Sequence, residues 1–197
     1  MELQECLDRM PKSIDDVSLG LYLSFNKEIK GLKEEDYKNI NGQMKLFRVV
    51  ELFVGVEEGE IDDISLEDMQ VLCETVSTLI TDGKKFEPSD HFTIDGINYS
   101  TRKIKDMNSL STGEYTSVKL IQEQHLEESE FLPLILAILI RPATLVIDDE
   151  SKEGRWVQER FNQKDIDNLT FRSELFKKKA LAKDLIPVCN FFLTGNE

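Results

Sequence analysis

The sequence holds few of the residues that build disulfide frameworks, membrane spans or secretion signals. Its 197 residues include only three cysteines, Cys6, Cys73 and Cys189, an odd number at wide and irregular spacing. That spacing argues against a disulfide framework and a zinc site, and it fits a reducing compartment. The longest uncharged apolar run, 131–140, is about half of the roughly 20 residues that a helix needs to cross a bilayer, so we expect no membrane contact. The acidic first residues lack the apolar stretch of a secretion signal.

Catalytic motifs are equally sparse. The two histidines, His91 and His125, stand apart from any recognisable Ser or Cys nucleophile, and we interpret both as surface residues. There is no glycine-rich phosphate loop, nucleophile elbow or paired-cysteine motif. The carboxylates Asp148, Asp149 and Glu150 lack the spacing of a calcium loop and suit the start of a helix. The sequence therefore predicts no catalytic residue, no cofactor and no metal.

Basic residues are missing from a long stretch of the N-terminal half. The net charge is −14, and residues 1–90 carry 21 acidic and 10 basic side chains, against 17 and 14 in residues 91–197. No Lys or Arg occurs between Arg48 and Lys84. Because affinity for phosphate backbones comes largely from these two residue types, direct nucleic-acid binding is disfavoured. The acidic 51–82 region is either a solvated face or a surface that meets a basic partner.

Apolar spacing predicts three helices in the first half, after a polar leader over residues 1–17 in which Pro11 breaks any early helix. The first helix begins at Ser18 and runs toward Leu32. The second is largely buried, ends near Gly55 and has an apolar stripe of Met44, Phe47, Val50 and Val54. The third begins at a capping box of Ser65 and Asp68, ends at Asp82-Gly83 and has an apolar face of Leu66, Met69, Leu72, Val76, Leu79 and Ile80.

A β-hairpin is predicted in the middle of the chain. Residues 92–99 alternate apolar and polar side chains around Asp95-Gly96, a dipeptide that accepts the positive φ angles of a type I′ turn. A lone hairpin is marginally stable, so we expect it to gain a third strand, to pack on a helix or to pair with another subunit. We expect residues 151–161 to be helical, which leaves this hairpin as the only β structure.

The C-terminal part reads as helical. Ser111 and Glu114 suit a helix start, because a hydroxyl caps free N–H groups and a carboxylate is favoured at the positive end of the helix dipole. The helix over 131–140 is apolar on every face and must be buried. Two more helices are expected over 165–179 and 181–192.

The predicted fold class is α+β, predominantly α-helical with one β-hairpin or a small antiparallel sheet. We expect an acidic helical region over 1–83, a hairpin region over 84–108 and a helical region over 109–197 that forms one compact domain with the first. The length of the chain suits such a domain.

Several short motifs follow one another in a set order within residues 15–193. They are Ile94-Asp95-Gly96 with Tyr99, Thr112-Gly113-Glu114-Tyr115, Leu132-Pro133, Ala137-Ile138-Leu139, Arg141-Pro142 and Asn190-Phe191-Phe192. In this order they resemble the small morphogenesis proteins of tailed bacteriophages, the tail assembly chaperones in particular. The resemblance implies a mostly helical, non-enzymatic protein that binds the helical tape measure protein or neighbouring tail proteins. In crAss-like phages a similar small protein remains in the virion as a structural or cargo component.

We therefore expect a non-enzymatic phage morphogenesis or virion structural protein that binds other phage proteins at the tail or portal, the tape measure protein or cargo. It would work in the host cytoplasm during assembly, be retained in the virion if structural, and be able to form an oligomer. We expect partner contacts at Leu185, Phe191, Phe192 and the ends of the two apolar helices, in a helix-in-groove mode. The competing interpretation places these side chains in the core.

Two alternatives from other functional classes stay open. The first is an acidic decoy that mimics nucleic acid and inhibits a DNA-binding enzyme, suggested by the stretch 49–83 that lacks basic residues. The second, less favoured, is a metal-dependent hydrolase that uses Asp148, Asp149 and Glu150. A decoy would release its target steeply with salt, whereas a hydrolase would bind a divalent cation.

Overall fold

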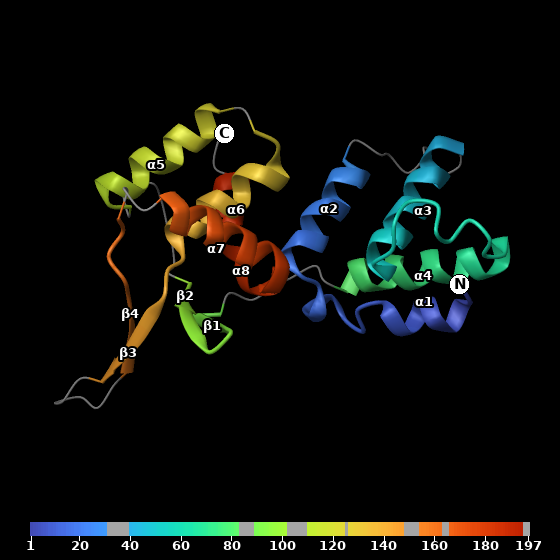
Figure 1. The fold of residues 1–197 in the computed structure, drawn as a ribbon, viewed down its shortest axis with the longest axis horizontal. Coiled ribbons are helices and arrows are strands. Elements are labelled where there is room, and N and C mark those ends of the chain that lie inside the picture. The colour runs from blue at the N-terminus through green and yellow to red at the C-terminus, as the bar shows by residue number, and fades with distance from the viewer. Residues whose placement is uncertain are drawn as a thin grey trace. The chain divides into compact units, whose positions relative to one another are not determined.

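The computed structural model describes residues 1–30, 40–82, 89–101, 110–124, 126–147, 154–162 and 166–194. The protein has the predicted α+β class: helices make up 62% of the described residues, and the strands form two antiparallel sheets of two strands each (Figure 1). The chain divides into two compact units, Met1–Lys85 and Phe86–Glu197, which we call unit 1 and unit 2. None of the helices in the described residues is long and apolar enough to span a membrane.

Unit 1 is helical, and two of its helices begin at the predicted hydroxyl caps. The backbone N–H of Leu21 donates to Ser18 Oγ at 3.2 Å, and that of Asp68 donates to Ser65 Oγ at 3.1 Å. The Ser65 hydroxyl in turn donates to the Asp68 carboxylate at 2.8 Å. The elements are α1 (Leu3–Arg9), the 3-10 turn η1 (Ile14–Asp16), α2 (Leu19–Ile29), α3 (Ile40–Val54) and α4 (Leu66–Asp82).

The prediction of a polar leader over residues 1–17 is wrong, because α1 forms there. Cys6 and Met10 are buried in the core of unit 1, and Pro11 follows the helix instead of breaking it. An ion pair of Arg9 and Glu5 at 2.7 Å, spaced one turn apart, supports the exposed face of α1. A short amphipathic helix with a single apolar stripe is thus stabilised by burial against its neighbours.

The core of unit 1 lies among its helices, and α3 ends at Val54, directly before Gly55, as predicted. Gly55 has φ +76°, a left-handed conformation that glycine adopts without strain. Met44 and Leu66, predicted on the apolar faces, are instead 63% and 81% exposed. Each precedes the buried apolar part of its helix. The largest buried contributions from α3 and α4 come from Val49, Val50, Phe53, Val54, Met69, Leu72, Val76 and Leu79.

Unit 2 contains the predicted hairpin, formed by β1 (His91–Ile94) and β2 (Ile97–Ser100). Asp95 and Gly96 have φ +51° and +79°, as the type I′ turn requires. The paired Phe92 and Tyr99 rings are 5.5 Å apart, and each meets the ring of Phe176 edge-on, at 5.8 and 5.3 Å. The hairpin is therefore stabilised by packing on a helix, one of the three predicted ways.

Four helices accompany this hairpin: α5 (Thr112–Glu123), α6 (Glu128–Leu139), α7 (Ile166–Lys179) and α8 (Ala182–Thr194). The capping box of α5 is complete, because Ser111 accepts from the Glu114 N–H and Glu114 accepts from the Ser111 N–H. As predicted, the apolar part of α6 is buried, with all residues from Leu132 to Leu139 except position 134 in the core and Pro133 in the early turns of the helix. Pro187 lies inside α8.

The predicted helix over 151–161 is wrong, because Gly154–Gln158 is a strand, β4. It pairs antiparallel with β3 (Ala143–Ile147), from Ala143 opposite Gln158 to Ile147 opposite Gly154. The sheet β3–β4 is a second hairpin that extends away from the helices of unit 2 (Figure 1). Gly154 lies close to the Leu145 side chain, since a Cβ there would be 3.0 Å from Leu145 Cδ1. The missing side chain at Gly154 leaves room for Leu145 of the paired strand, which favours the strand conformation at this position.

Candidate functional site

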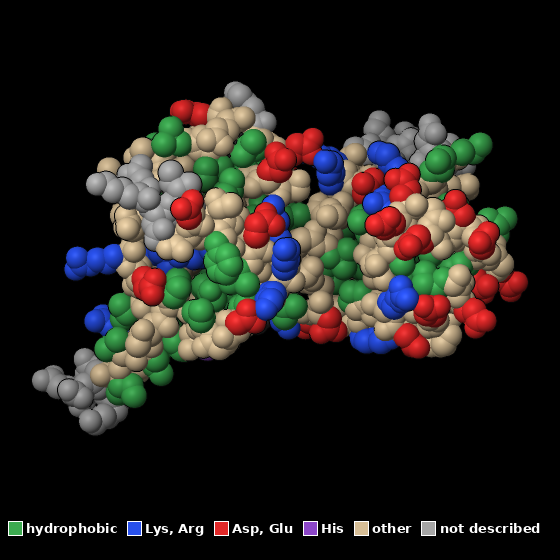
Figure 2. Space-filling view, in the orientation of Figure 1, with side chains coloured by type: hydrophobic (Ala, Val, Ile, Leu, Met, Phe, Trp, Pro, Cys, Tyr) green, Lys and Arg blue, Asp and Glu red, His purple; other side chains and the backbone are tan. Residues whose placement is uncertain are grey.

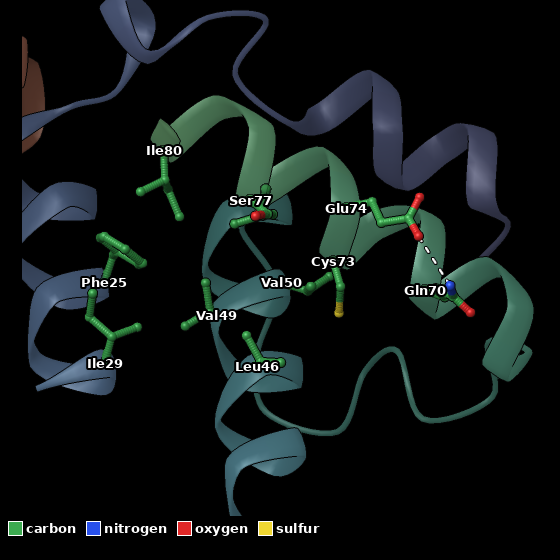
Figure 3. A pocket seen from close by; sticks show the side chains of 11 residues that line it. Phe25, Ile29, Leu46, Val49, Val50, Gln70, Cys73, Glu74, Ser77 and Ile80 are labelled. Atoms are coloured by element: carbon green, nitrogen blue, oxygen red, sulfur yellow. Dashed lines mark hydrogen bonds between the residues drawn. The ribbon is translucent and has the colours of Figure 1, made fainter. Parts of the chain in front are cut away.

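An apolar groove opens in unit 1 among α2, α3 and α4 (Figure 3). Its volume is about 430 Å³. Phe25 and Ile29 project into it from α2, and Leu46 and Val49 from α3, while α4 closes the third side (Figure 3). The other lining residues are Val50, Gln70, Cys73, Glu74, Val76, Ser77 and Ile80.

The floor and the rim of this groove differ in burial. Phe25, Val49 and Val50 are buried and belong to the core of unit 1, so the floor is fixed by packing. The Phe25 ring meets Phe53 edge-on at 5.9 Å, which holds α2 against α3. Leu46 on the rim is only half-buried. A rigid apolar floor with an accessible apolar rim is suited to receive apolar side chains from another molecule.

Polar groups of the groove come from α4. Glu74 is exposed and accepts a hydrogen bond of 3.1 Å from the Gln70 side chain, one turn earlier (Figure 3). Burial raises the pKa of the half-buried Cys73 thiol above its ordinary value, and the neighbouring Glu74 carboxylate raises it further. A thiol with a raised pKa is less nucleophilic at neutral pH than a free thiol.

The loop between α3 and α4 is acidic and exposed. The buried Glu51 carboxylate organises it by accepting from the Gly59 N–H at 2.5 Å and from Arg48 at 3.1 Å. In Figure 2 acidic side chains are spread over the visible face of unit 1. The exposed carboxylates of the loop belong to Glu57, Glu58, Glu60, Asp62 and Asp63.

Unit 2 has a polar hollow of about 750 Å³ beside β4. Its charged lining residues are Arg141, Arg155, Arg160, Asp90 and Glu159. Its deepest cation, Arg141, already donates to the Glu114 carboxylate and to the carbonyls of Ile138 and Glu159, all within 2.8 Å. The hollow thus mixes both signs of charge, and its central guanidinium is used to hold the fold together. We consider the groove of unit 1 the stronger candidate site.

The residues predicted as partner contacts lie in α8. Leu185 is fully buried in unit 2, a position that favours the competing interpretation as core. The side chains of Phe191 and Phe192 lie outside the described part of the structure, so their role stays a prediction. Asp148, Asp149 and Glu150 also lie outside the described residues.

His125 lies outside the described residues as well, and the other histidine has an aromatic neighbour. The ring of His91 is stacked on that of Trp156 at 4.4 Å, which joins β1 to β4. His91 itself is exposed, as predicted. Its ring therefore contributes to the contact between the two hairpins.

The sequence contained a partial signal for the groove. The apolar face of α4 is interrupted by Gln70, Cys73 and Ser77, which are smaller or more polar than the leucines around them. Such an interruption at helical spacing indicates a place where a helix does not pack fully against its neighbours. The depth of the groove also depends on how far α2 lies from α4. The apolar spacing within a helix does not specify this distance.

Comparison of the chain with models of known protein families, with curated proteins and with solved structures gives no match.

Proposed function

We propose that this protein is a non-enzymatic assembly protein that binds other proteins, and that the groove of unit 1 receives an apolar helix of the partner. The observation that carries the proposal is the open apolar lining, with half-buried Ile29, Leu46 and Ile80 around a buried floor. An amphipathic helix binds such a groove through apolar residues spaced three and four apart. Each apolar residue of the partner helix that is buried in the groove contributes about 1.5–3 kcal/mol to the binding free energy, and two or three such residues fit this mode.

The biological setting that we propose is the assembly of a tailed bacteriophage. It is supported by the motif order described above, which resembles tail assembly chaperones and small virion proteins. The partners would be tail or portal proteins, the helical tape measure protein or cargo, and binding would take place in the host cytoplasm. Retention in the virion would make the protein a structural component instead of a transient chaperone.

The test compares a groove variant with a matched control. Leu46→Glu places a charge on the apolar rim, whereas Leu66→Glu changes an 81% exposed leucine in the first turn of α4, where a carboxylate is favoured. Each tagged protein is expressed with the products of its neighbouring genes, and captured proteins are quantified by mass spectrometry. We expect wild type and Leu66→Glu to retain the same phage protein and Leu46→Glu to lose it. If both variants capture the partner equally and their circular dichroism spectra are unchanged, the proposal that the groove binds the partner is contradicted.

A second candidate function is the acidic decoy, favoured by the exposed carboxylates of the loop 57–63. A decoy would bind a basic DNA-binding enzyme mainly through charge, so its affinity would fall steeply between low and high salt. Binding through the apolar groove depends little on salt. A salt titration of the captured complex therefore separates the two candidates.

A further inference from the structure

Charge is unevenly distributed around the apolar groove of unit 1. The helix α4, which forms one side of the groove, contains no Lys or Arg, and neither residue occurs anywhere between Arg48 and Lys84. The exposed cations of the other two sides are Lys27 of α2, Lys30 directly after it and Lys45 of α3. The side chains of α4 therefore contribute only negative charge to the surroundings of the groove.

One edge of α4 carries polar side chains along the groove. Glu67, Gln70 and Glu74 follow one another at spacings of three and four residues, which places them on the same side of the helix. All three are exposed, and Gln70 and Glu74 line the groove (Figure 3). At 1.5 Å per residue, Glu67 and Glu74 lie about 10 Å apart along the helix axis. The two carboxylates thus border the apolar lining over two helical turns.

Neither of these carboxylates has a cation within the described ranges of the chain. Glu74 accepts from the Gln70 side chain at 3.1 Å, whereas the buried Glu51 of α3 is paired with Arg48 at 3.1 Å. A partner that covers an unpaired carboxylate removes water from it, and this loss is unfavourable unless the partner supplies a donor or a cation. An acidic partner would in addition place like charges opposite each other. The edge of α4 therefore favours a basic partner.

We propose that the occupant of the groove is a basic amphipathic helix, whose apolar face fills the groove and whose Lys or Arg residues lie against Glu67 and Glu74. The inference rests on the proposed function, because it names the chemistry of the helix that the groove would receive. Basic residues seven positions apart match the two-turn separation of the carboxylates. The other flank of the helix faces α2 and α3, so the basic residues are expected on one flank only.

The test uses three labelled helical peptides and the full chain, with binding measured by fluorescence anisotropy. The first peptide has leucines at three- and four-residue spacing and lysines along one flank. The second has glutamates in place of the lysines, and the third keeps the lysines but has serines in place of the leucines. We expect the lysine–leucine peptide to bind at least about tenfold more tightly than either of the others. Higher salt should narrow its advantage over the glutamate peptide, because salt screens exposed charges.

Two matched variants locate the preference on the protein. Glu74→Lys reverses the charge at the groove, and the control Glu58→Lys makes the same change at an exposed loop residue that does not line the groove. Glu74→Lys should weaken binding of the lysine–leucine peptide by about fivefold, and Glu58→Lys by less than about twofold. Leu46→Glu, on the apolar rim, should weaken both leucine peptides.

The outcomes separate this inference from the proposed function. Equal affinities of the two leucine peptides, both lowered by Leu46→Glu, overturn the inference and leave the groove as a binding site. Equal weakening by Glu74→Lys and Glu58→Lys also overturns it, because the net charge would then explain the preference. Binding of the serine peptide as tight as that of the lysine–leucine peptide favours the acidic decoy instead. If neither leucine peptide binds, the proposed function and the inference fail together.

Discussion

The guanidinium of Arg141 donates to the carboxylate of Glu114 across 2.7 Å in the interior of unit 2, with both side chains at least nine-tenths buried. Glu114 simultaneously closes the capping box of α5 by accepting from the Ser111 N–H at 2.7 Å. Arg141 also donates to carbonyls at the end of α6 and beyond β4. One ion pair therefore joins the start of one helix, the end of another and the second hairpin.

Breaking this pair should destabilise unit 2. Arg141→Met leaves the Glu114 carboxylate buried without its cation, and the loss of one partner of a buried pair typically costs about 3–5 kcal/mol. Lys177→Met, at an exposed ion pair with Glu174 in α7 of the same unit, should cost at most about 1 kcal/mol. The measurement is urea unfolding followed by the fluorescence of Trp156, the single tryptophan, which lies in unit 2. Similar midpoints for the two variants would refute the role given to the pair.

The aromatic contact between the first hairpin and α7 should depend on one phenylalanine. Phe176 is fully buried against Phe92 and Tyr99, so Phe176→Ala should lower the free energy of unfolding by about 3–5 kcal/mol. Phe171→Ala, on the same helix but 68% exposed, should change it by less than about 0.5 kcal/mol. Chemical denaturation of both variants decides the point, and equal losses would show that the hairpin is held in another way.

The cysteines of unit 1 should differ in reactivity and in its pH dependence. Burial raises the pKa of both Cys73 and Cys6, and Cys6 is in addition fully inaccessible. Alkylation of Cys73 in the native protein should be slower than that of a free thiol at pH 8 and should accelerate above that pH, while Cys6 should react only on unfolding. Peptide mapping by mass spectrometry measures both rates. Labelling of Cys6 as fast as Cys73 would contradict the buried position of α1.

The same pKa shifts affect stability in a definite direction. A thiol whose pKa is raised by folding keeps its proton in the folded state over a range in which the unfolded chain has lost it. Its contribution is therefore fully present below the unfolded pKa and is lost as pH rises through the folded pKa. We expect unit 1 to lose stability at alkaline pH, and Cys73→Ser to reduce that loss in denaturation curves measured at several pH values. A pH dependence that Cys73→Ser leaves unchanged would assign the loss to other groups.

Local rules of the sequence were sufficient for three helix starts and for the first hairpin. Ser18, Ser65 and Ser111 act as caps because a hydroxyl at that position satisfies a free N–H whatever the tertiary context. Asp95-Gly96 specifies its turn in the same way, through positive φ. These signals act within four residues, so they can be recognised without knowing the fold.

Features that depend on distant contacts were not predictable. Residues 151–161 read as a helix with Trp156 and Phe161 as inward residues, yet the conformation of β4 follows from pairing with β3 and from the close approach of Gly154 to Leu145. The helix α1 was missed because its burial depends on α3 and α4, which begin more than thirty residues later in the chain. The groove likewise depends on three helices at once, and the exposure of Met44 shows how an apolar residue can lie outside the core.

The measurement that tests the central claim most directly is the alkylation rate of Cys73, which lines the groove, in the free protein and in the purified complex with its captured partner. A partner helix seated in the groove covers this thiol, so the account predicts at least a tenfold slower reaction in the complex and no effect on the rate at a cysteine introduced by Ile97→Cys in unit 2. An unchanged Cys73 rate in a complex that stays intact would place the partner elsewhere and contradict the account.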